Sequence, residues 1–342
     1  MYALELVGEE DAFAAREAST AAGGVERVAP GLATARSVDR ERLERVAYTR
    51  AASRLLAETD ASVEGARAAA TTASLGDRTG SVAVRARDVR ATAGVSTTEA
   101  ERAVGGVLVD RGFEVDLDDP DHEFRVLFAG DTCLLGWLAV ESNRDYGSRK
   151  PTDRPFFQPG SMDPLDARAY ANLAGAGPGR TVLDPMCGTG GLLVEAGLAG
   201  SRVVGVDAQS KMVRGSRENL EAYLDGGYDV VRGDATRLPV ADGAVDGVVV
   251  DAPYGRQSKI AGHELDELLR EALGEFRRVA PRCVLVADRR WTDAAREAGW
   301  HVERVFERRV HRSLVRHVHL LDTEPDEQSV PARALGADDD QA

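Results

Sequence analysis

The chain has 342 residues, of which 43% are hydrophobic, and its net charge at neutral pH is -14. This length suits two domains of ordinary size better than a single core. No stretch approaches the roughly 20 consecutive apolar residues that cross a bilayer, and the first residues lack the basic start and apolar segment of a signal peptide. We therefore expect a cytosolic protein that does not insert into a membrane.

The acidic balance argues at first against a nucleic-acid partner, because neutralising phosphates supplies most of such binding energy. However, all but three of the 43 basic residues are arginine, set in a background rich in Asp and Glu. This bias resembles proteins of salt-accumulating halophiles, in which an acidic surface is an adaptation to the solvent. The net charge therefore leaves open both an RNA-binding protein and a plain acidic protein that never touches RNA.

The part of the chain before residue 149 has an α+β pattern. Ser96 and Glu99 have the spacing of a capping box and so predict the start of a helix. Short alternating runs bounded by turn residues predict strands. In chain order the predicted elements are a strand over 2–7, helices over 10–22 and 39–58, a strand over 82–85, a helix over 96–111, and strands over 114–117, 122–128 and 133–141.

Two segments have no periodic pattern. Residues 149–155 hold two prolines and three cations, which predicts an extended linker that we place over 149–162. The final stretch, 323–342, is polar and acidic, which predicts a disordered tail.

After the linker, strands that are apolar almost throughout alternate with helices. The predicted elements are strands over 181–184, 202–207, 228–233, 245–251 and 283–288, and helices from 190 and over 211–223, 264–279 and 292–298. This alternation indicates a doubly wound parallel sheet with helices on both faces. Residues 301–322 then predict two strands joined by a tight turn near His311, and an antiparallel hairpin that closes a parallel sheet is typical of class I methyltransferases.

The first of these strands ends in an acid and a glycine-rich turn, Asp184-Pro-Met-Cys-Gly-Thr-Gly-Gly191. Gly188 and Gly190 would let the backbone approach a ligand closely. A dinucleotide fingerprint has GxGxxG without the preceding acid and proline, so this motif favours a methyl donor. A tight turn without any ligand is the weaker alternative, because a buried strand-end acid is costly without a partner.

Two further acids follow at the ends of the next strands. Asp207 lies 19 residues after Gly188, where a carboxylate can accept hydrogen bonds from both ribose hydroxyls; alone, it would equally suit a helix cap. Asp234 follows the third strand, where it can receive an adenine amino group, although a turn-forming Gly-Asp is an equal alternative.

The fourth strand ends in Asp251-Ala-Pro-Tyr254, which resembles the D/N-P-P-Y/F motif of amino methyltransferases. An exocyclic amine is a poor nucleophile because its lone pair is delocalised into the ring. The Asp251 carboxylate and the Ala252 carbonyl can each accept an N–H and orient the amine. Pro253 would aim that carbonyl, and Tyr254 would stack on a flipped base. Ala252 replaces the usual first proline, which puts some rigidity and hence the rate in doubt.

Neither the histidines nor the cysteines indicate a metal site. His317 and His319 would share one strand face, but with no third ligand nearby a solvent-facing pair is the expected arrangement. Cys133, Cys187 and Cys283 are far apart and form no CxxC pattern, so we expect neither a disulfide nor zinc.

Taken as a whole, the chain resembles the archaeal THUMP-containing tRNA guanine-N2 methyltransferases, most of all those that dimethylate the guanine at position 10. The resemblance covers nearly the whole chain apart from the tail. It rests on the two motifs that begin at Asp184 and Asp251 and on the narrower linker stretch Arg154-Pro-Phe-Phe-Gln-Pro-Gly-Ser-Met162. The strand Val82-Ala-Val-Arg-Ala-Arg87 and the helix capped at Ser96 add to it.

The resemblance implies a ferredoxin-like part over 1–60, a THUMP domain over 61–148 and a Rossmann-like methyltransferase domain over 163–322. It implies S-adenosylmethionine as cofactor, tRNA as partner and no metal, and we expect a monomer. The donor site maps to Asp184, Gly188, Gly190, Asp207 and Asp234, and the catalytic site to Asp251, Ala252, Pro253 and Tyr254. It further suggests phosphate contacts, for which solvated surface is an equal alternative, at Arg85, Arg87, Arg149, Lys150 and Arg154.

Other functions stay open at this point. The target could be another tRNA guanine, such as position 6, or a ribosomal guanine. A DNA adenine enzyme shares the logic of the motif at Asp251 but would not be expected to carry the N-terminal half. From a different class, the chain could be an RNA-binding module without activity; the intact Asp251 and glycine loop argue against this, and Ala252 argues weakly for it.

Overall fold

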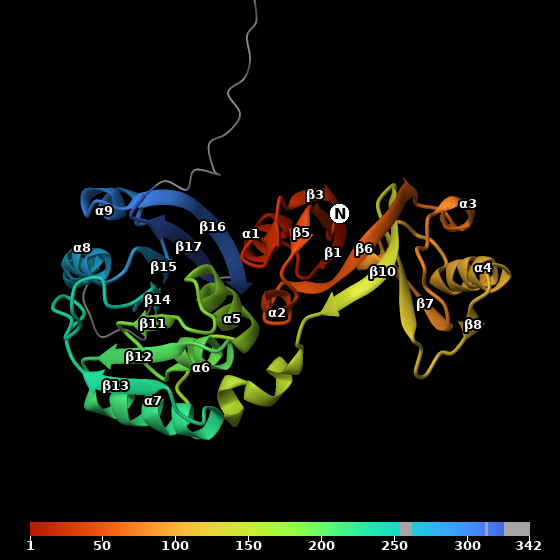
Figure 1. Cartoon of the computed structure of the whole chain (residues 1–342). Coiled ribbons are helices and arrows are strands. Elements are labelled where there is room, and N and C mark those ends of the chain that lie inside the picture. Colours follow the sequence, from red (N-terminus) through yellow and green to blue (C-terminus); the bar gives the residue numbers. More distant parts are fainter. Residues whose placement is uncertain (254–261, 312–313, 325–342) are drawn as a thin grey trace, which may run out of the picture. The chain divides into compact units, whose positions relative to one another are not determined.

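The computed structural model describes residues 1–253, 262–311 and 314–324, and the chain forms two compact units (Figure 1). The first comprises Met1–Leu173 with Leu198–Gly200, and the second comprises Ala174–Gly197 and the chain from Ser201 onward. Each unit has its own sheet. Among the described residues, no helix is both long and apolar enough to cross a membrane.

The N-terminal unit is built on an eight-stranded mixed sheet in the order β3-β4-β1-β6-β10-β9-β7-β8. Its strands are β1 (Tyr2–Leu6), β3 (Glu26–Ala29), β4 (Leu32–Ala35), β6 (Thr49–Asp60), β7 (Ser81–Asp88), β8 (Glu114–Val115), β9 (His122–Ala129) and β10 (Thr132–Glu141). A small pair, β2 (Ala22–Gly23) and β5 (Ser37–Val38), lies apart from it. The helices are α1 (Asp11–Ala18), α2 (Arg40–Leu43), α3 (Val63–Thr72), α4 (Thr97–Asp110) and α5 (Pro164–Leu173).

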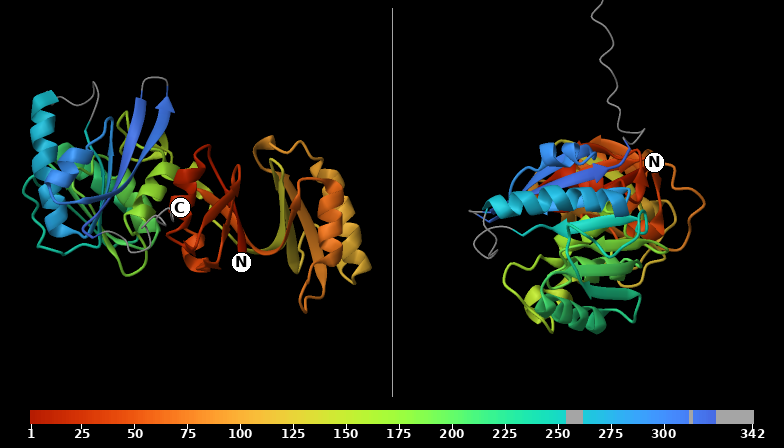
Figure 2. Two further views of the ribbon diagram at one scale, coloured as in Figure 1. Left: turned by 90° about the horizontal axis from the view of Figure 1, so that it is seen from above. Right: turned by 90° about the vertical axis from the view of Figure 1, so that its left-hand side faces the viewer.

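Helices α3 and α4 cover one face of this sheet (Figure 2). The core beneath them contains Phe124 and Trp137, whose rings meet edge to face with centroids 4.9 Å apart. Helix α4 begins as predicted: the Ser96 hydroxyl accepts a hydrogen bond from the Glu99 backbone N–H at 3.4 Å. The division of this unit into a ferredoxin-like and a THUMP part stays a prediction.

The predicted helix over 39–58 is wrong. The structure has the single turn α2 and then the long strand β6. The stretch is rich in Ala, Arg, Leu and Glu, which are good helix formers, but β6 lies inside the sheet and pairs with both β1 and β10. Two ladders of hydrogen bonds and burial of its first half outweigh the local propensity.

Helix α5 belongs to the N-terminal unit, although it lies within 163–322, and two side-chain hydrogen bonds tie it to that unit. Asn172 donates a hydrogen bond from Nδ2 to Glu17 of α1 at 2.8 Å, and the Tyr48 hydroxyl donates to Asp166 at 2.6 Å. Burial raises the pKa of Glu17, whose carboxyl also accepts the backbone N–H groups of Ala47 and Tyr48. The short 3-10 turn η2 (Asp145–Arg149) ends at the start of the predicted linker, and a second turn, η3 (Pro151–Asp153), lies within it.

The C-terminal unit has a seven-stranded sheet in the order β13-β12-β11-β14-β15-β17-β16, which is the doubly wound arrangement expected. The strands are β11 (Thr181–Asp184), β12 (Arg202–Asp207), β13 (Tyr228–Arg232), β14 (Gly247–Asp251), β15 (Arg282–Ala287), β16 (His301–His311) and β17 (Leu314–Asp322). The first five are parallel, and β17 and β16 are antiparallel. The helices are α6 (Gly191–Leu198), α7 (Ser210–Tyr223), α8 (Gly262–Val279) and α9 (Thr292–Glu297).

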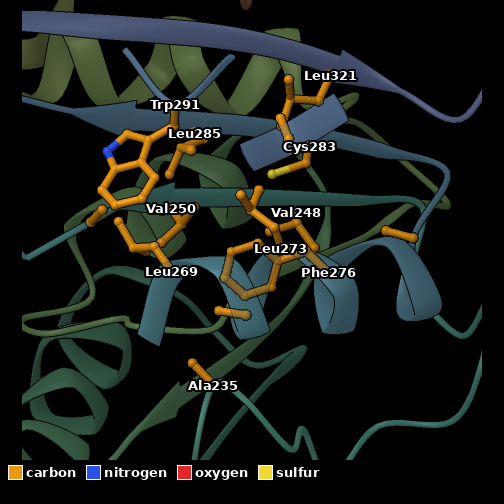
Figure 3. Close-up of a cluster of buried hydrophobic side chains, with 14 of the residues drawn as sticks. Ala235, Val248, Val250, Leu269, Leu273, Phe276, Cys283, Leu285, Trp291 and Leu321 are labelled. Carbon is orange, nitrogen blue, oxygen red and sulfur yellow. The ribbon is translucent and has the colours of Figure 1, made fainter. Parts of the chain in front are cut away.

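The central strands of this sheet pack against α8 (Figure 3). Leu269, Leu273 and Phe276 recur at helical spacing on α8 and are buried against Val248 and Val250 of β14. Alternation along β14 then turns Val249 and Asp251 to the opposite face. The core under α8 therefore fixes the direction in which Asp251 points.

The expected solvent-facing pair of histidines on β17 is also wrong. His319 is fully buried: its Nε2 accepts the Trp291 backbone N–H at 2.9 Å, and its Nδ1–H donates to the Leu285 carbonyl at 3.1 Å. Burial lowers the pKa of His319 to about 4, so the ring is neutral at pH 7. The imidazole thus links β17, β15 and the start of α9. This role depends on two contacts with residues distant in sequence, so the strand pattern did not indicate it.

Candidate active site

Three acids end three adjacent strands of the C-terminal sheet, namely Asp184 on β11, Asp207 on β12 and Asp251 on β14. Asp184 is level with Gly205, two residues before Asp207. Leu183 is level with Val248, so Asp184 continues level with Val249, two residues before Asp251. Because side chains alternate along a strand, all three carboxyl groups lie on one face at the carboxyl edge of the sheet.

The three carboxyl groups influence one another. Burial raises the pKa of Asp184 well above its usual range, and the charges of Asp207 and Asp251 raise it further. Asp184 is 2% exposed, and its carboxylate accepts the Met186 backbone N–H at 3.0 Å. A cation bound at this edge would relieve the repulsion among the acids.

The glycine loop after β11 is held close to β12. Gly188 donates its backbone N–H to the Asp207 carboxylate at 3.0 Å, and Cys187 donates to the Val206 carbonyl at 3.0 Å. Asp207 also accepts the Gln209 backbone N–H at 2.8 Å, and burial raises its pKa. Asp207 thus sets the shape of the loop, a role that the sequence pattern did not show.

Gly188 and Gly190 both have left-handed backbones, with φ of 50° and 74°. A Cβ at Gly190 would collide with the Ser216 hydroxyl of α7, whereas a Cβ at Gly188 would meet nothing closer than the Met186 carbonyl at 4.0 Å. Gly190 therefore lets the loop pack on α7, and Gly188 leaves open space beside the three acids.

Asp234 follows β13, next to β12 at the same edge. Its side chain is exposed and accepts hydrogen bonds from the Thr236 backbone N–H at 2.9 Å and from the Thr236 hydroxyl at 2.8 Å. This is the geometry of a turn-forming Asp, and it also presents the carboxylate to solvent at the edge.

Ala252 and Pro253 leave the sheet directly after Asp251. The Ala252 N–H donates to the Val286 carbonyl of β15 at 2.9 Å, which extends the strand pairing by one residue. A proline at this position would have no N–H to donate. The rigidity in doubt at Ala252 is supplied here by a backbone hydrogen bond. The last residue of the motif, Tyr254, lies outside the described residues.

Sequence reasoning missed one charged neighbour of this site. Arg316 on β17 places its Nη2 3.9 Å from Asp251 Oδ2, and the side chain of Arg316 is only 6% exposed. The alternation of polar and apolar residues around Arg316 did not indicate this contact, because Arg316 and Asp251 are 65 positions apart in the sequence.

The predicted phosphate-contacting residues divide into two groups. Arg149 and Arg154 are each 4% exposed, and Arg149 is paired with Asp145 at 2.8 Å, so the structure does not support them as phosphate contacts. Lys150 is exposed. Arg87 is half-exposed and lies 3.2 Å from Glu5, and Arg85 donates to the Leu117 carbonyl at 2.6 Å.

Within the described part of the chain, no group of three or more His, Cys, Asp or Glu side chains has the arrangement of a metal site. Cys187 lies in the glycine loop, but burial raises its thiol pKa well above the usual value. A protonated thiol is a poor nucleophile, so this environment does not suit Cys187 to nucleophilic attack.

The sheet order, the antiparallel hairpin and the acids at the carboxyl edge define a class I, Rossmann-like methyltransferase. Residues 151–318 match the model of the RMKL-like methyltransferase domain family. The chain is 37% identical to the tRNA (guanine(10)-N2)-dimethyltransferase of Methanothermobacter thermautotrophicus, over 67% of this chain and 69% of that protein. It is 34% identical to the protein of the same name from Pyrococcus abyssi, over 71% and 74%. The chain belongs to this tRNA (guanine(10)-N2)-dimethyltransferase family.

A more distant relative has a different target. The tRNA (guanine(6)-N2)-methyltransferase of Thermus thermophilus is 32% identical over 47% of this chain and 48% of its own length.

Proposed function

We propose that this protein transfers methyl groups from S-adenosylmethionine to N2 of a guanine in tRNA, at position 10, giving first the monomethyl and then the dimethyl product. The observation that carries the proposal is the placement of Asp251, Ala252 and Pro253 at the end of β14, on the edge that also holds the glycine loop. Family membership supports the substrate and the position. The acidic, arginine-rich composition supports a halophilic source, and the proposal includes a cytosolic enzyme that works as a monomer.

The residues at the edge fit the donor. Gly188 leaves open space beside three carboxyl groups, which suits a ligand with positive charge, and S-adenosylmethionine supplies a methyl group activated by a sulfonium. Asp207 would accept hydrogen bonds from the ribose hydroxyls, Asp234 from the adenine amino group, and Asp184 would face the charged end. Gly190 keeps the loop packed on α7 and so holds this arrangement.

For catalysis, the Asp251 carboxylate and the Ala252 carbonyl would each accept one N–H of the guanine amine. Holding both hydrogens in the plane of the base directs the nitrogen lone pair out of it. The first transfer forms the N–CH3 bond as the sulfonium C–S bond breaks and S-adenosylhomocysteine leaves, and the methylated amine then gives up one proton to solvent. One N–H remains, and one acceptor is enough to orient it for the second transfer. Pro253 keeps the Ala252 carbonyl extended, and Tyr254 would stack on the base.

The N-terminal unit would bind the tRNA as a ferredoxin-like part and a THUMP domain, with a linker that leads into the catalytic domain. Of the predicted phosphate contacts, Lys150 is exposed, while Arg85 and Arg87 are partly exposed on β7. Each of these has a protein partner or solvent already, so contact with RNA would exchange one polar environment for another.

The test is methyl transfer to unmodified tRNA in high salt, followed by mass spectrometry of mapped fragments. We expect dimethylguanosine at position 10 and no product on a transcript with adenine there. Product at position 6 would favour the specificity named for the Thermus thermophilus relative. Binding of the donor without transfer to any RNA would favour an inactive binding module.

Asp251→Ala should abolish transfer while calorimetry shows nearly unchanged affinity for S-adenosylhomocysteine. Asp242→Ala is the matched control, because Asp242 is an exposed acid of the same unit whose partner is Arg278. Wild-type turnover in the Asp251 variant would contradict the role proposed for that carboxylate.

A further inference from the structure

The C-terminal hairpin brings an arginine to the catalytic acid, and the strand register explains how. Asp251 of β14 is level with Val286 of β15, which is level with Val318 of β17. Arg316 precedes Val318 by two residues, so it lies on the same face of the sheet as Asp251. Its Nη2 is 3.9 Å from Asp251 Oδ2.

This contact is electrostatic. A separation of 3.9 Å is too long for a hydrogen bond, but the side chains are only 6% and 23% exposed, so little solvent screens the two charges. Burying a guanidinium costs solvation energy that an ion pair seldom returns in full. A buried arginine is therefore a poor device for stability, and its position beside the acid at the reaction site suggests a functional role.

Other charged groups lie on the same face of the sheet as Asp251 and Arg316. Asp184 from β11 and Asp207 from β12 contribute negative charge at the same edge, and Arg308 of β16 is level with Arg316. On β15 the position level with Asp251 is the apolar Val286. The pairing of Ala287 with His317 places the exposed Asp288, just past the end of β15, level with Arg316, so it adds a further acid to this face. With only the acids nearby, Asp251 would take up a proton more easily, and a protonated carboxyl is a weaker acceptor for an amine N–H.

We propose that Arg316 is a positioning residue that keeps the Asp251 carboxylate charged and turned toward the target amine. This inference rests on the proposed function, because it assigns a role in that reaction. Arg316 acts through Asp251 and need not touch the substrate. The hairpin that closes the sheet thereby becomes part of the reaction site.

The test compares Arg316→Gln and Arg316→Lys with wild type in steady-state methyl transfer to tRNA across a range of pH. In R316Q we expect kcat to fall about tenfold or more, with KM for tRNA nearly unchanged. The acidic limb of kcat/KM should move up by about one pH unit, since loss of the cation makes Asp251 easier to protonate. R316K keeps a charge and should recover part of kcat and return the limb toward wild type.

Arg290→Gln is the matched control. Arg290 adjoins the same hairpin and pairs with Glu307 at 2.7 Å, and both side chains are exposed. Its loss removes one arginine and one ion pair without touching Asp251, so rate and pH profile should stay at wild-type values.

A second measurement needs no activity and covers the case in which R316Q is poorly folded. The side-chain carbons of labelled aspartate are titrated by NMR in wild type, R316K and R316Q, with Asp251→Asn for assignment. Asp251 should titrate at higher pH in R316Q than in the other two. An unchanged titration, or a rise in KM with no shift of the acidic limb, would overturn the inference, whereas a wild-type protein inactive on every tRNA would overturn the proposed function alone.

Discussion

The backbone N–H of Ala252 donates a hydrogen bond to the carbonyl of Val286 at 2.9 Å. The bond continues the pairing of β14 and β15 past Asp251, into the segment whose carbonyl would accept the target amine. Alanine at this position is therefore compatible with a rigid motif, because strand pairing replaces the restraint of a proline ring.

The first prediction is that Ala252→Pro destabilises the protein, although proline is usual at this place in the motif. The change removes a hydrogen bond worth about 1 kcal/mol and adds ring atoms where the alanine is only 2% exposed. Urea unfolding followed by tryptophan fluorescence should show the loss. Ala252→Gly keeps the N–H and serves as control; a proline variant more stable than wild type would show that the hydrogen bond matters little.

The second prediction separates two glycines of one loop. Gly190→Ala meets both a strained backbone and the Ser216 hydroxyl, whereas Gly188→Ala meets the strained backbone alone. We expect Gly188→Ala to cost about 1 kcal/mol of stability and Gly190→Ala about 2 to 3 kcal/mol, each measured by urea unfolding.

The double variant Gly190→Ala with Ser216→Gly removes the collision and isolates the strain. Its stability, relative to Ser216→Gly alone, should fall by about as much as in Gly188→Ala. Equal costs for the two single variants would mean that the loop moves away from α7 freely.

Much of the C-terminal unit could be predicted because its strands are buried on both faces. Segments such as Val203-Val204-Gly205-Val206 are apolar throughout and end in an acid, so strand type and strand end are both visible. Since adjacent parallel strands end at one edge, Asp184, Asp207 and Asp251 could be brought together without knowing any contact.

The remaining features depend on partners distant in sequence. Strand β6 has the composition of a helix, and only its two neighbours in the sheet make it a strand. His319 looks like any strand-face histidine until Trp291 and Leu285 are in place around it. Arg316 becomes a neighbour of Asp251 only through the register of three strands, which sequence pattern alone does not set.

The third prediction is that donor binding releases protons. Burial raises the pKa values of Asp184 and Asp207, so in the free protein they hold protons to higher pH than usual. A bound cation favours their charged forms, lowers the pKa values in the complex and expels protons. Affinity should therefore increase with pH on the acidic side.

Calorimetry with S-adenosylmethionine in buffers of different ionisation enthalpy, at mildly acidic pH, measures the number of protons released. Asp184→Asn should lower the number of protons released. The control is Asp229→Asn, which should not lower it, because Asp229 is an exposed acid paired with Arg202 at the opposite end of β12. Heats that are the same in every buffer would mean that the donor's charge does not act on these carboxyls.

The last prediction concerns His319, whose pKa burial lowers to about 4. The unfolded chain takes up this proton near its ordinary pKa of about 6.5, while the folded protein resists it until about pH 4. The neutral His319 ring therefore makes its full contribution to the free energy of unfolding above pH 6.5. This contribution is lost as pH falls toward 4, by about 1.4 kcal/mol per pH unit and on the order of 3 kcal/mol in all. Buried acids with raised pKa values, such as Asp184, have the opposite slope, so the effect must be isolated by a variant.

The measurement has two parts. NMR of the histidine rings should show that His319 does not titrate between pH 8 and 5. The free energy of unfolding should fall more steeply between pH 7 and 5 in wild type than in His319→Gln. The control is His122→Gln, a substitution in the N-terminal unit, which should leave the pH dependence of unfolding of the C-terminal unit unchanged. A ring that titrates near pH 6.5 would mean that the bonds to Trp291 and Leu285 do not hold the imidazole neutral. The junction of β15, β17 and α9 would then tolerate a charge, and acid would not loosen the hairpin that carries Arg316.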